Sequence, residues 1–147
     1  ASEADILKVL ERYGIENNKV NLWGTGTPLR EFLWSEDMAD ASVHVLLNVD
    51  FKDTYKDDER DIRNCHINVG TGKEITIKEV AEKIMATIGF KGELRWDASK
   101  PDGTMKKLTD VTKLHNLGWH HKIEIDEGVR LLYDWYKKGI CINHKEA

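Results

Sequence analysis

The chain has 147 residues, with 22 lysines and arginines against 26 aspartates and glutamates, which gives a formal charge of −4 when histidine is neutral. A composition of 40% hydrophobic and 33% charged residues fits one globular domain and excludes a disordered chain or a disulfide-stapled miniprotein. The mild acidity, without a basic stripe, excludes the phosphate-neutralising surface that a nucleic-acid partner requires.

Targeting signals and cysteines point to an ordinary intracellular protein. No apolar run approaches the roughly 18 residues that span a bilayer, and residues 1–5 lack the basic and apolar regions of a signal peptide. We therefore expect a soluble, cytoplasmic protein with no membrane partner. Cys65 and Cys141 lie far apart, without a C-x-x-C motif, and are interpreted as plain thiols.

The first third of the sequence predicts a helix, a strand and a second helix. Apolar residues at three- and four-residue spacing over residues 4–13, followed by Gly14, predict a helix that ends at the glycine. Residues 19–23 have a strand pattern, and the Gly-Thr-Gly-Thr-Pro run of residues 24–28 predicts a sharp turn. We expect the hydroxyl of Ser35 to cap the second helix. The apolar stripe of that helix is Met38, Ala41, Val45 and Leu46.

The middle of the sequence contains a charged segment and then a strongly marked helix. Residues 50–64 crowd charges of both signs without periodicity, which predicts a charged loop or insertion. Residues 66–69 resume a strand pattern, and a second Gly-Thr-Gly run at residues 70–72 predicts another sharp turn. Thr76 and Glu79 have the spacing of a capping box, which predicts a helix after them.

The last third of the sequence continues the alternation of strands and helices. Residues 93–96 predict a strand, and residues 100–104 carry the Pro-Asp-Gly pattern of a tight turn. Asp110 is expected to cap a short helix closed by Gly118, and residues 126–138 predict the last helix. Alternating strands and helices indicate one α/β domain over the whole chain, with a small sheet of short strands packed with about five helices.

The two Gly-Thr-Gly turns are similar to nucleotide-binding fingerprints but complete none of them. The dinucleotide motif G-x-G-x-x-G would need glycine at Leu29 or at Ile75. A P-loop would need glycine at Ile67 and serine or threonine at Glu74. We interpret both turns as ordinary turn glycines.

A Tyr/Lys pair and the histidines are similar to catalytic and metal-binding motifs, but both have simpler explanations. Tyr133 and Lys137 stand four residues apart, the spacing at which a lysine lowers the pKa of a catalytic tyrosine in one class of reductases. Here the apolar face of the C-terminal helix explains Tyr133 as a core residue. The six histidines form no H-x-x-x-H motif and no His/Cys cluster, so we predict no metal site.

Trp23 and Arg30 are the residues that suggest ligand binding. An arginine after a glycine-rich turn can present two parallel donors to a diphosphate, and an indole can lie against a base or a sugar. The alternative for Arg30 is a surface salt bridge to a nearby carboxylate, and spacing alone leaves both open. The carboxylates within reach are Glu31, Glu36 and Asp37.

Longer stretches of the sequence resemble a known family. Residues 23–41 resemble the substrate-domain signature of extended short-chain dehydrogenases/reductases. Residues 67–72, the Asp-Ala-Ser-Lys-Pro-Asp-Gly-Thr run at 97–104 and the Leu-His-x-Leu-Gly-Trp run at 114–119 narrow the resemblance to the GDP-L-fucose synthase family. The resemblance covers roughly residues 19–138.

This resemblance implies a fold, a substrate and a division of labour. The family epimerises GDP-4-keto-6-deoxy-mannose and reduces it with NADPH to GDP-L-fucose. No stretch of this sequence matches the family's dinucleotide fingerprint or its catalytic residues. The resemblance therefore implies the C-terminal substrate-binding segment, which binds a GDP-sugar but no cofactor and is inactive alone. The intact enzyme would add an N-terminal Rossmann domain that binds NADP, and would be a homodimer.

Four residues match positions at which the family contacts its substrate. The resemblance implies GDP contacts for Trp23 and Arg30 and another substrate contact for Asp102. It also implies a basic contact at Lys8, for which Arg12 is a rival. Two alternatives stay open: the substrate domain of another nucleotide-sugar epimerase or dehydratase, and a non-enzymatic nucleotide-binding or interaction module.

Overall fold

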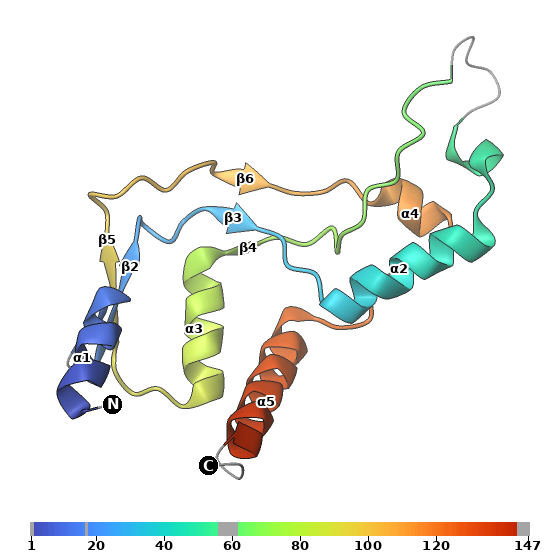
Figure 1. Cartoon of the computed structure of the whole chain (residues 1–147). Coiled ribbons are helices and arrows are strands. Elements are labelled where there is room, and N and C mark those ends of the chain that lie inside the picture. The colour runs from blue at the N-terminus through green and yellow to red at the C-terminus, as the bar shows by residue number, and fades with distance from the viewer. Residues whose placement is uncertain (1, 17, 56–61, 144–147) are drawn as a thin grey trace. The chain divides into compact units, whose positions relative to one another are not determined.

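The computed structural model describes residues 2–16, 18–55 and 62–143 of the chain. Backbone contacts divide it into two compact units, one formed by Ala1–Arg30 with Ile75–Lys106 and the other by Glu31–Glu74 with Lys107–Ala147. Figure 1 labels the elements of both units in chain order. Each unit combines two separate stretches of sequence, so each fold depends on contacts between residues far apart in the chain.

Helix α1 (Glu3–Arg12) opens the first unit. The hydroxyl of Ser2 accepts the backbone N–H of Asp5 at 3.2 Å, and the Asp5 carboxylate accepts the backbone N–H of Ser2 at 3.1 Å. This reciprocal capping satisfies donors that a helix N-terminus otherwise leaves unpaired. The helix ends before Gly14, whose φ of 77° favours glycine. The predicted first helix is confirmed.

Strand β2 (Lys19–Trp23) is the centre of the first sheet. It pairs antiparallel with β1 (Ile15–Glu16) and parallel with β5 (Glu93–Asp97), which lies beside it in Figure 1. In the parallel pair, Trp23 stands opposite Asp97. Both strands therefore end at the same edge of the sheet. The strands predicted at residues 19–23 and 93–96 are confirmed.

A second, smaller sheet has β3 (Leu29–Arg30) at its centre. Its neighbours are β4 (Ile75–Thr76) and β6 (Lys106–Lys107), and β3 and β4 run antiparallel. Pro28 lies in the turn that separates β2 from β3, and its carbonyl accepts the backbone N–H of Ile77 at 3.0 Å. This bond ties the turn to the start of the helix that follows β4.

Helix α3 (Ile77–Ile88) begins with the predicted capping box. The Thr76 hydroxyl accepts the backbone N–H of Glu79 at 3.1 Å, and the Glu79 carboxylate accepts the backbone N–H of Thr76 at 2.9 Å. Gly89 ends the helix in the left-handed conformation, with φ of 72°. Sequence and structure agree over this whole element.

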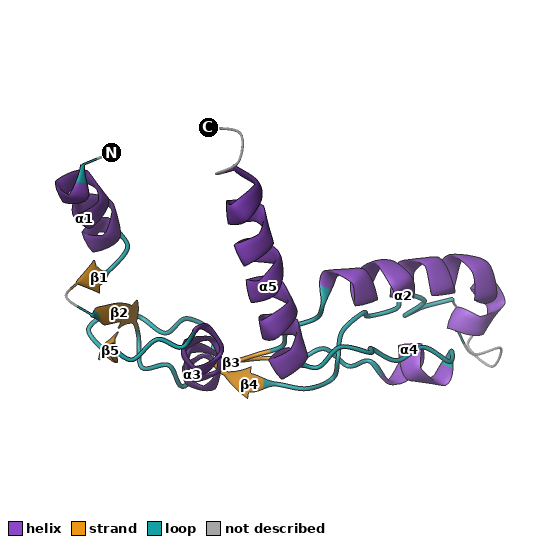
Figure 2. Cartoon of the chain, turned by 90° about the horizontal axis from the view of Figure 1, so that it is seen from below, coloured by secondary structure: helices purple, strands orange, loops and turns teal. Residues whose placement is uncertain are grey.

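The second unit is mostly helical. Its elements are α2 (Ser35–Asn48), the 3-10 helix η1 (Phe51–Thr54), α4 (Thr112–Asn116) and α5 (Ile125–Asn143). Helix α4 lies alongside α2 in both Figure 1 and Figure 2. The fully buried side chains of Ala41 from α2 and Leu114 from α4 form a core there with Trp119, which is 4% exposed. This core explains why the sequence between residues 110 and 119 folds back onto α2.

The strand predicted at residues 66–69 is wrong. This segment has no strand assignment, and within the described residues no strand pairs with it. Its alternation of polar and apolar residues has another cause, because Ile67 and Val69 pack against the core that contains Trp119. Alternate residues of an extended segment can cover a core without a β-ladder.

Two details of the predicted second helix are also wrong. Ser35 is the first residue of α2, and Trp34 occupies the cap position without a side-chain hydrogen bond. The acidic first turn, with Glu36 and Asp37, suits the positive end of the helix dipole without a hydroxyl cap. Leu46 is 80% exposed and Met38 is 44% exposed, so neither belongs to the buried face of the helix.

The predicted α/β class with short strands is confirmed. Within the described residues there are five α-helices and two small sheets, where we predicted a single sheet. The charged segment at 50–64 contains η1, and its residues 56–61 lie outside the described part. None of the described helices combines the length and the apolar character needed to cross a membrane.

Candidate functional site

The four residues expected to bind substrate all belong to the first unit. Trp23 is the last residue of β2, and Arg30 is the last residue of β3. Asp102 lies in the loop between β5 and β6, and Lys8 lies on α1. The structure brings Trp23 and Asp102 into one loop cluster, as the following contacts show.

Asp102 clasps the first Gly-Thr-Gly turn. Its Oδ1 accepts the backbone N–H of Thr25 at 2.6 Å, and its Oδ2 accepts the Thr25 hydroxyl at 2.7 Å. Two hydrogen bonds from Thr25 lower the pKa of Asp102 below its usual range, and the bond from the backbone N–H has a larger effect than the bond from the hydroxyl. Gly24 has φ of 80°, and a Cβ there would collide with the Asp102 carboxylate. The turn sequence therefore fits a carboxylate at this position.

Trp23 stands next to this turn with its side chain open to solvent. The residue is 76% exposed, although an indole of this size is usually well buried. Lys100 places its Nζ 5.7 Å from the centroid of the indole ring, within the range of a cation–π contact. The ring is thus held near a cation and remains accessible to a planar ligand.

Arg30 is half-buried on β3. Its Nη1 donates to the Leu29 carbonyl at 2.7 Å. Within the described residues, none of the carboxylates expected as alternatives forms an ion pair with Arg30. Glu31 instead accepts backbone amides, and Asp37 accepts the amides of residues 122 and 123. A guanidinium carries five N–H donors, so Arg30 keeps donors for a ligand.

Lys8 and Arg12 remain equivalent as the basic substrate contact. Both are exposed on α1, and Arg12 is the last residue of that helix. In the described part of the chain neither of them takes part in an ion pair. Both cationic groups are therefore accessible, and the assignment of Lys8 stays a prediction.

The second Gly-Thr-Gly turn also holds a carboxylate. In the second unit, the Glu31 Oε1 accepts the backbone N–H of Thr71 at 2.5 Å and that of Gly72 at 2.7 Å. Its Oε2 accepts the backbone N–H of Thr109 at 3.0 Å. Burial raises the pKa of Glu31, but these hydrogen bonds outweigh burial and hold the pKa below its ordinary value. Both turns thus bind a carboxylate of the chain itself.

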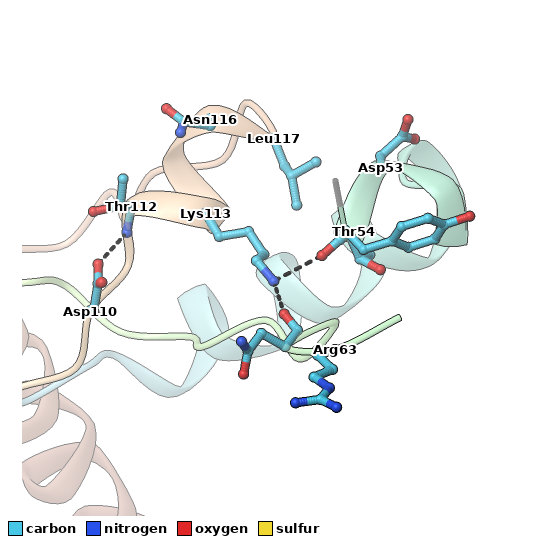
Figure 3. Close-up of a pocket in the computed structure, with 10 residues that line it drawn as sticks. Asp53, Thr54, Arg63, Asp110, Thr112, Lys113, Asn116 and Leu117 are labelled. Carbon is cyan, nitrogen blue, oxygen red and sulfur yellow. Dashed lines mark hydrogen bonds between the residues drawn. The ribbon is translucent and has the colours of Figure 1, made fainter. Parts of the chain in front are cut away.

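A cavity of about 510 Å³ lies in the second unit (Figure 3). Its lining residues are Asp53, Thr54, Tyr55, Arg63, Asn64, Asp110, Thr112, Lys113, Asn116 and Leu117. Lys113 donates to the backbone carbonyls of Thr54 at 2.9 Å and His66 at 3.0 Å, and also to that of Asn64. These bonds use all three donors of an ammonium group. Lys113 therefore stabilises this loop through hydrogen bonds to its backbone. None of the residues expected to bind substrate lines the cavity.

Asp110 caps α4 differently from the prediction. Its carboxylate accepts the backbone N–H of Thr112 at 3.0 Å, as Figure 3 shows. The cap position itself belongs to Val111, which has no side-chain hydrogen bond to the helix. Asp110 thus stabilises the first turn from one residue further back.

The remaining motifs of the sequence have the following surroundings in the described part of the chain. Lys137 lies with its Nζ 4.5 Å from the Tyr133 ring centroid and 3.0 Å from the Asp134 carboxylate, so it is engaged on its own helix. Over the residues that the structure describes, no group of three potential ligands could hold a metal ion. Cys65 is a free, exposed cysteine, and the side chain of Cys141 lies outside the described part.

Two residues of the loop cluster were missed from the sequence. Thr25 carries the contacts to Asp102, and Lys100 lies over Trp23. The signal for Thr25 was a hydroxyl residue between two turn glycines, which can donate both its N–H and its O–H to one acceptor. For Lys100 the only sequence signal is its place before the Pro-Asp-Gly turn, since its partner Trp23 is 77 positions away.

Comparison with known proteins gives one consistent group of relatives. The model of the NAD dependent epimerase/dehydratase family matches residues 3–70. GDP-L-fucose synthase of Escherichia coli (strain K12) is 47% identical over 117 residues, which cover 80% of this chain and 36% of that protein. The solved structure of a GDP-6-OMe-4-keto-L-xylo-heptose reductase from C. jejuni has a TM-score of 0.87 and 43% identity, and the match covers 95% of this chain and 39% of that chain.

A further solved structure was determined with a cofactor. The GDP-D-glycero-L-gluco-heptose synthase from Campylobacter jejuni, in the presence of NADPH, has a TM-score of 0.83 and 42% identity, covering 93% of this chain and 38% of that chain. The chain spans about a third of the length of the curated relatives it matches. Over most of its length, the chain is therefore similar to a segment of GDP-L-fucose synthases and related GDP-sugar reductases, as its sequence indicated.

Proposed function

We propose that this chain is the C-terminal substrate-binding segment of a GDP-L-fucose synthase and binds the GDP part of its substrate. The observation that carries the proposal is the exposed indole of Trp23 beside a turn that Asp102 clasps. In this proposal, the epimerisation and the NADPH-dependent reduction take place on residues outside this chain. The segment supplies binding energy from the non-reacting handle of the substrate, which positions the reacting sugar.

The position of Trp23 in the sheet supports this proposal. In open α/β sheets, ligands bind beyond the carboxyl ends of the parallel strands. Trp23 and Asp97 are the paired last residues of the parallel strands β2 and β5. The loops that follow these strands contain Thr25 and Asp102, so the clasped turn lies where a ligand of such a sheet is expected.

Arg30 supports binding of a diphosphate. Its guanidinium is half-buried, where a hydrogen bond to a charged group is worth more than at a fully exposed position. One donor is engaged by the Leu29 carbonyl, and a planar guanidinium can offer a further pair to phosphate oxygens. We assign to Arg30 the role of holding the diphosphate.

NADP does not fit the two glycine-rich turns of this chain. Pyrophosphate groups of dinucleotides bind to free backbone amides of such turns. Here Asp102 takes the amide of Thr25, and Glu31 takes those of Thr71 and Gly72. A phosphate would have to displace a carboxylate of the chain from either turn. We therefore assign no cofactor contact to these residues.

A second candidate function is the corresponding segment of a GDP-heptose-modifying enzyme. The TM-score of 0.87 and the 43% identity to the C. jejuni reductase favour it. The two candidates share the GDP part of the substrate and differ in the sugar. The proposal of a GDP-binding role is therefore common to both.

The test is Arg30→Ala in the complete polypeptide that the reading frame encodes. We expect the apparent dissociation constant for GDP to rise about tenfold or more, since one or two charged hydrogen bonds are lost. Arg95→Ala is the matched control, because Arg95 belongs to the same unit and pairs with Glu93 at 3.2 Å on β5. If Arg30→Ala binds GDP as tightly as the control does, Arg30 has no place in the site.

A further inference from the structure

Lys100 is held next to Trp23 by a defined turn. The Asp97 carboxylate accepts the backbone N–H of Ser99 at 3.0 Å and its hydroxyl at 2.5 Å, and the Asp97 carbonyl accepts the backbone N–H of Lys100 at 3.1 Å. The same carbonyl accepts the backbone N–H of Gly24 at 3.0 Å. A single residue, Asp97, thus anchors both the turn that carries Lys100 and the backbone that follows Trp23.

The contact between the two side chains places a cation against an exposed aromatic ring. The Nζ of Lys100 lies 5.7 Å from the indole centroid of Trp23, and cations within about 6 Å of a ring centroid are attracted by its negative face. Lys100 is itself exposed, and Trp23 is 76% exposed. The contact therefore restrains the ring without burying it.

We propose that Lys100 is a positioning residue, which restrains the Trp23 indole from one face so that the ring presents its accessible surface to the base of the bound nucleotide. This inference rests on the proposed function. A base stacks on an aromatic side chain through its π-face, and a ring that is already oriented loses less conformational freedom when the ligand binds. Lys100 thus acts on the base through Trp23 and makes no contact with the diphosphate.

The test compares guanosine with GDP as ligands of the complete polypeptide. Lys100→Met removes the charge and keeps the length of the side chain, and Lys100→Arg keeps a cation that stacks on aromatic faces. The loss of an exposed cation–π contact weakens binding by about two- to fivefold. We expect this factor for guanosine and for GDP alike in Lys100→Met, and affinities close to the original in Lys100→Arg. Lys91→Met, which removes an exposed lysine from the loop before β5, should bind both ligands as the unaltered protein does.

A Trp23→Ala background tests whether Lys100 acts through the indole. There, Lys100→Met should cause no further loss of affinity, since two residues that act through one contact are not additive. Unchanged binding of both ligands by Lys100→Met overturns the inference. A loss confined to GDP also overturns it, because Lys100 would then act on the phosphates. If the unaltered protein binds neither guanosine nor GDP, the proposed function itself fails and this inference fails with it.

Discussion

The carboxylate of Asp102 binds Thr25 from 77 positions away, through the backbone N–H at 2.6 Å and the hydroxyl at 2.7 Å. Glu31 binds the turn at Thr71 in the same manner, with the backbone N–H at 2.5 Å. Both Gly-Thr-Gly turns therefore donate hydrogen bonds to carboxylates of the same chain. Amides of such turns attract any anion, which explains why their sequences are similar to phosphate-binding loops although neither completes the motif.

We expect alanine substitutions at Gly26 and at Gly103 to differ clearly in their effect on stability. Gly26 has φ of 76°, and a Cβ there would lie 2.7 Å from the Trp96 ring, whereas Gly103 has φ of 73° with nothing within 4 Å. Gly26→Ala and Gly103→Ala share the strain of the left-handed conformation, and only Gly26→Ala adds a collision with a half-buried ring. We expect Gly26→Ala to lower the free energy of unfolding by about 1–3 kcal/mol more than Gly103→Ala.

Chemical denaturation of the two variants measures this difference. Equal losses would mean that the Trp96 ring moves aside without cost. In that case the packing of the turn against β5 would be looser than the structure shows.

We expect the Glu31 carboxylate to stabilise the fold near neutral pH and to lose this effect in acid. Its pKa in the folded state lies below the ordinary value of 4.5, since hydrogen bonds from Thr109, Gly72 and Thr71 outweigh the opposing effect of burial. A lowered folded-state pKa stabilises the fold at pH values above the unfolded-state pKa, and this stabilisation disappears as the pH falls through the folded-state pKa. We therefore expect the free energy of unfolding to decrease below about pH 4.5.

The Glu31→Gln variant isolates this contribution. Other carboxylates titrate in the same range, so the informative quantity is the difference between the two stability curves. That difference should be about 1.5–3 kcal/mol near neutral pH and should shrink as the pH falls. Glu82→Gln, on the exposed side of α3, is the control. A pH-independent difference would show that the charge of Glu31 does not hold the turn.

We expect the buried carboxylate of Asp37 to contribute far more to stability than the exposed carboxylate of its neighbour Glu36. The residue is 3% exposed, and its carboxylate accepts the backbone N–H groups of Lys122 at 3.0 Å and Ile123 at 2.9 Å. Asp37→Ala leaves these donors without a partner and should cost roughly 2–4 kcal/mol. Glu36→Ala removes an exposed carboxylate from the same helical turn, where it accepts the Trp34 indole N–H at 3.3 Å, and should cost no more than about 1 kcal/mol. Thermal unfolding of both variants decides this, and similar melting temperatures would contradict it.

Local sequence signals predicted the elements whose stabilising contacts are local. The helix after Thr76 was predicted through its capping box and Gly89, because both signals lie within a few residues of the helix ends. The strands ending at Trp23 and Asp97 were also predicted, since their pattern and the turns behind them are local features.

Elements that depend on distant contacts were predicted less well. The alternation of Ile67 and Val69 predicts a strand, but these residues pack against a core formed by Ala41, Leu114 and Trp119. The residues of the site came from a family resemblance, and their contacts could not be predicted. The bonds of Asp102 to Thr25 and of Glu31 to Thr109 join positions more than 70 residues apart, and the cation of Lys100 reaches its indole in the same way.

Calorimetric titration of the complete polypeptide with GDP and with UDP tests the central claim most directly. A nucleotide-sugar segment of the GDP-L-fucose synthase type should bind GDP more tightly than UDP, and Arg30→Ala should weaken the binding of GDP. A preference for UDP would assign the chain to another nucleotide-sugar enzyme, and the absence of heat with either nucleotide would contradict a nucleotide-binding role.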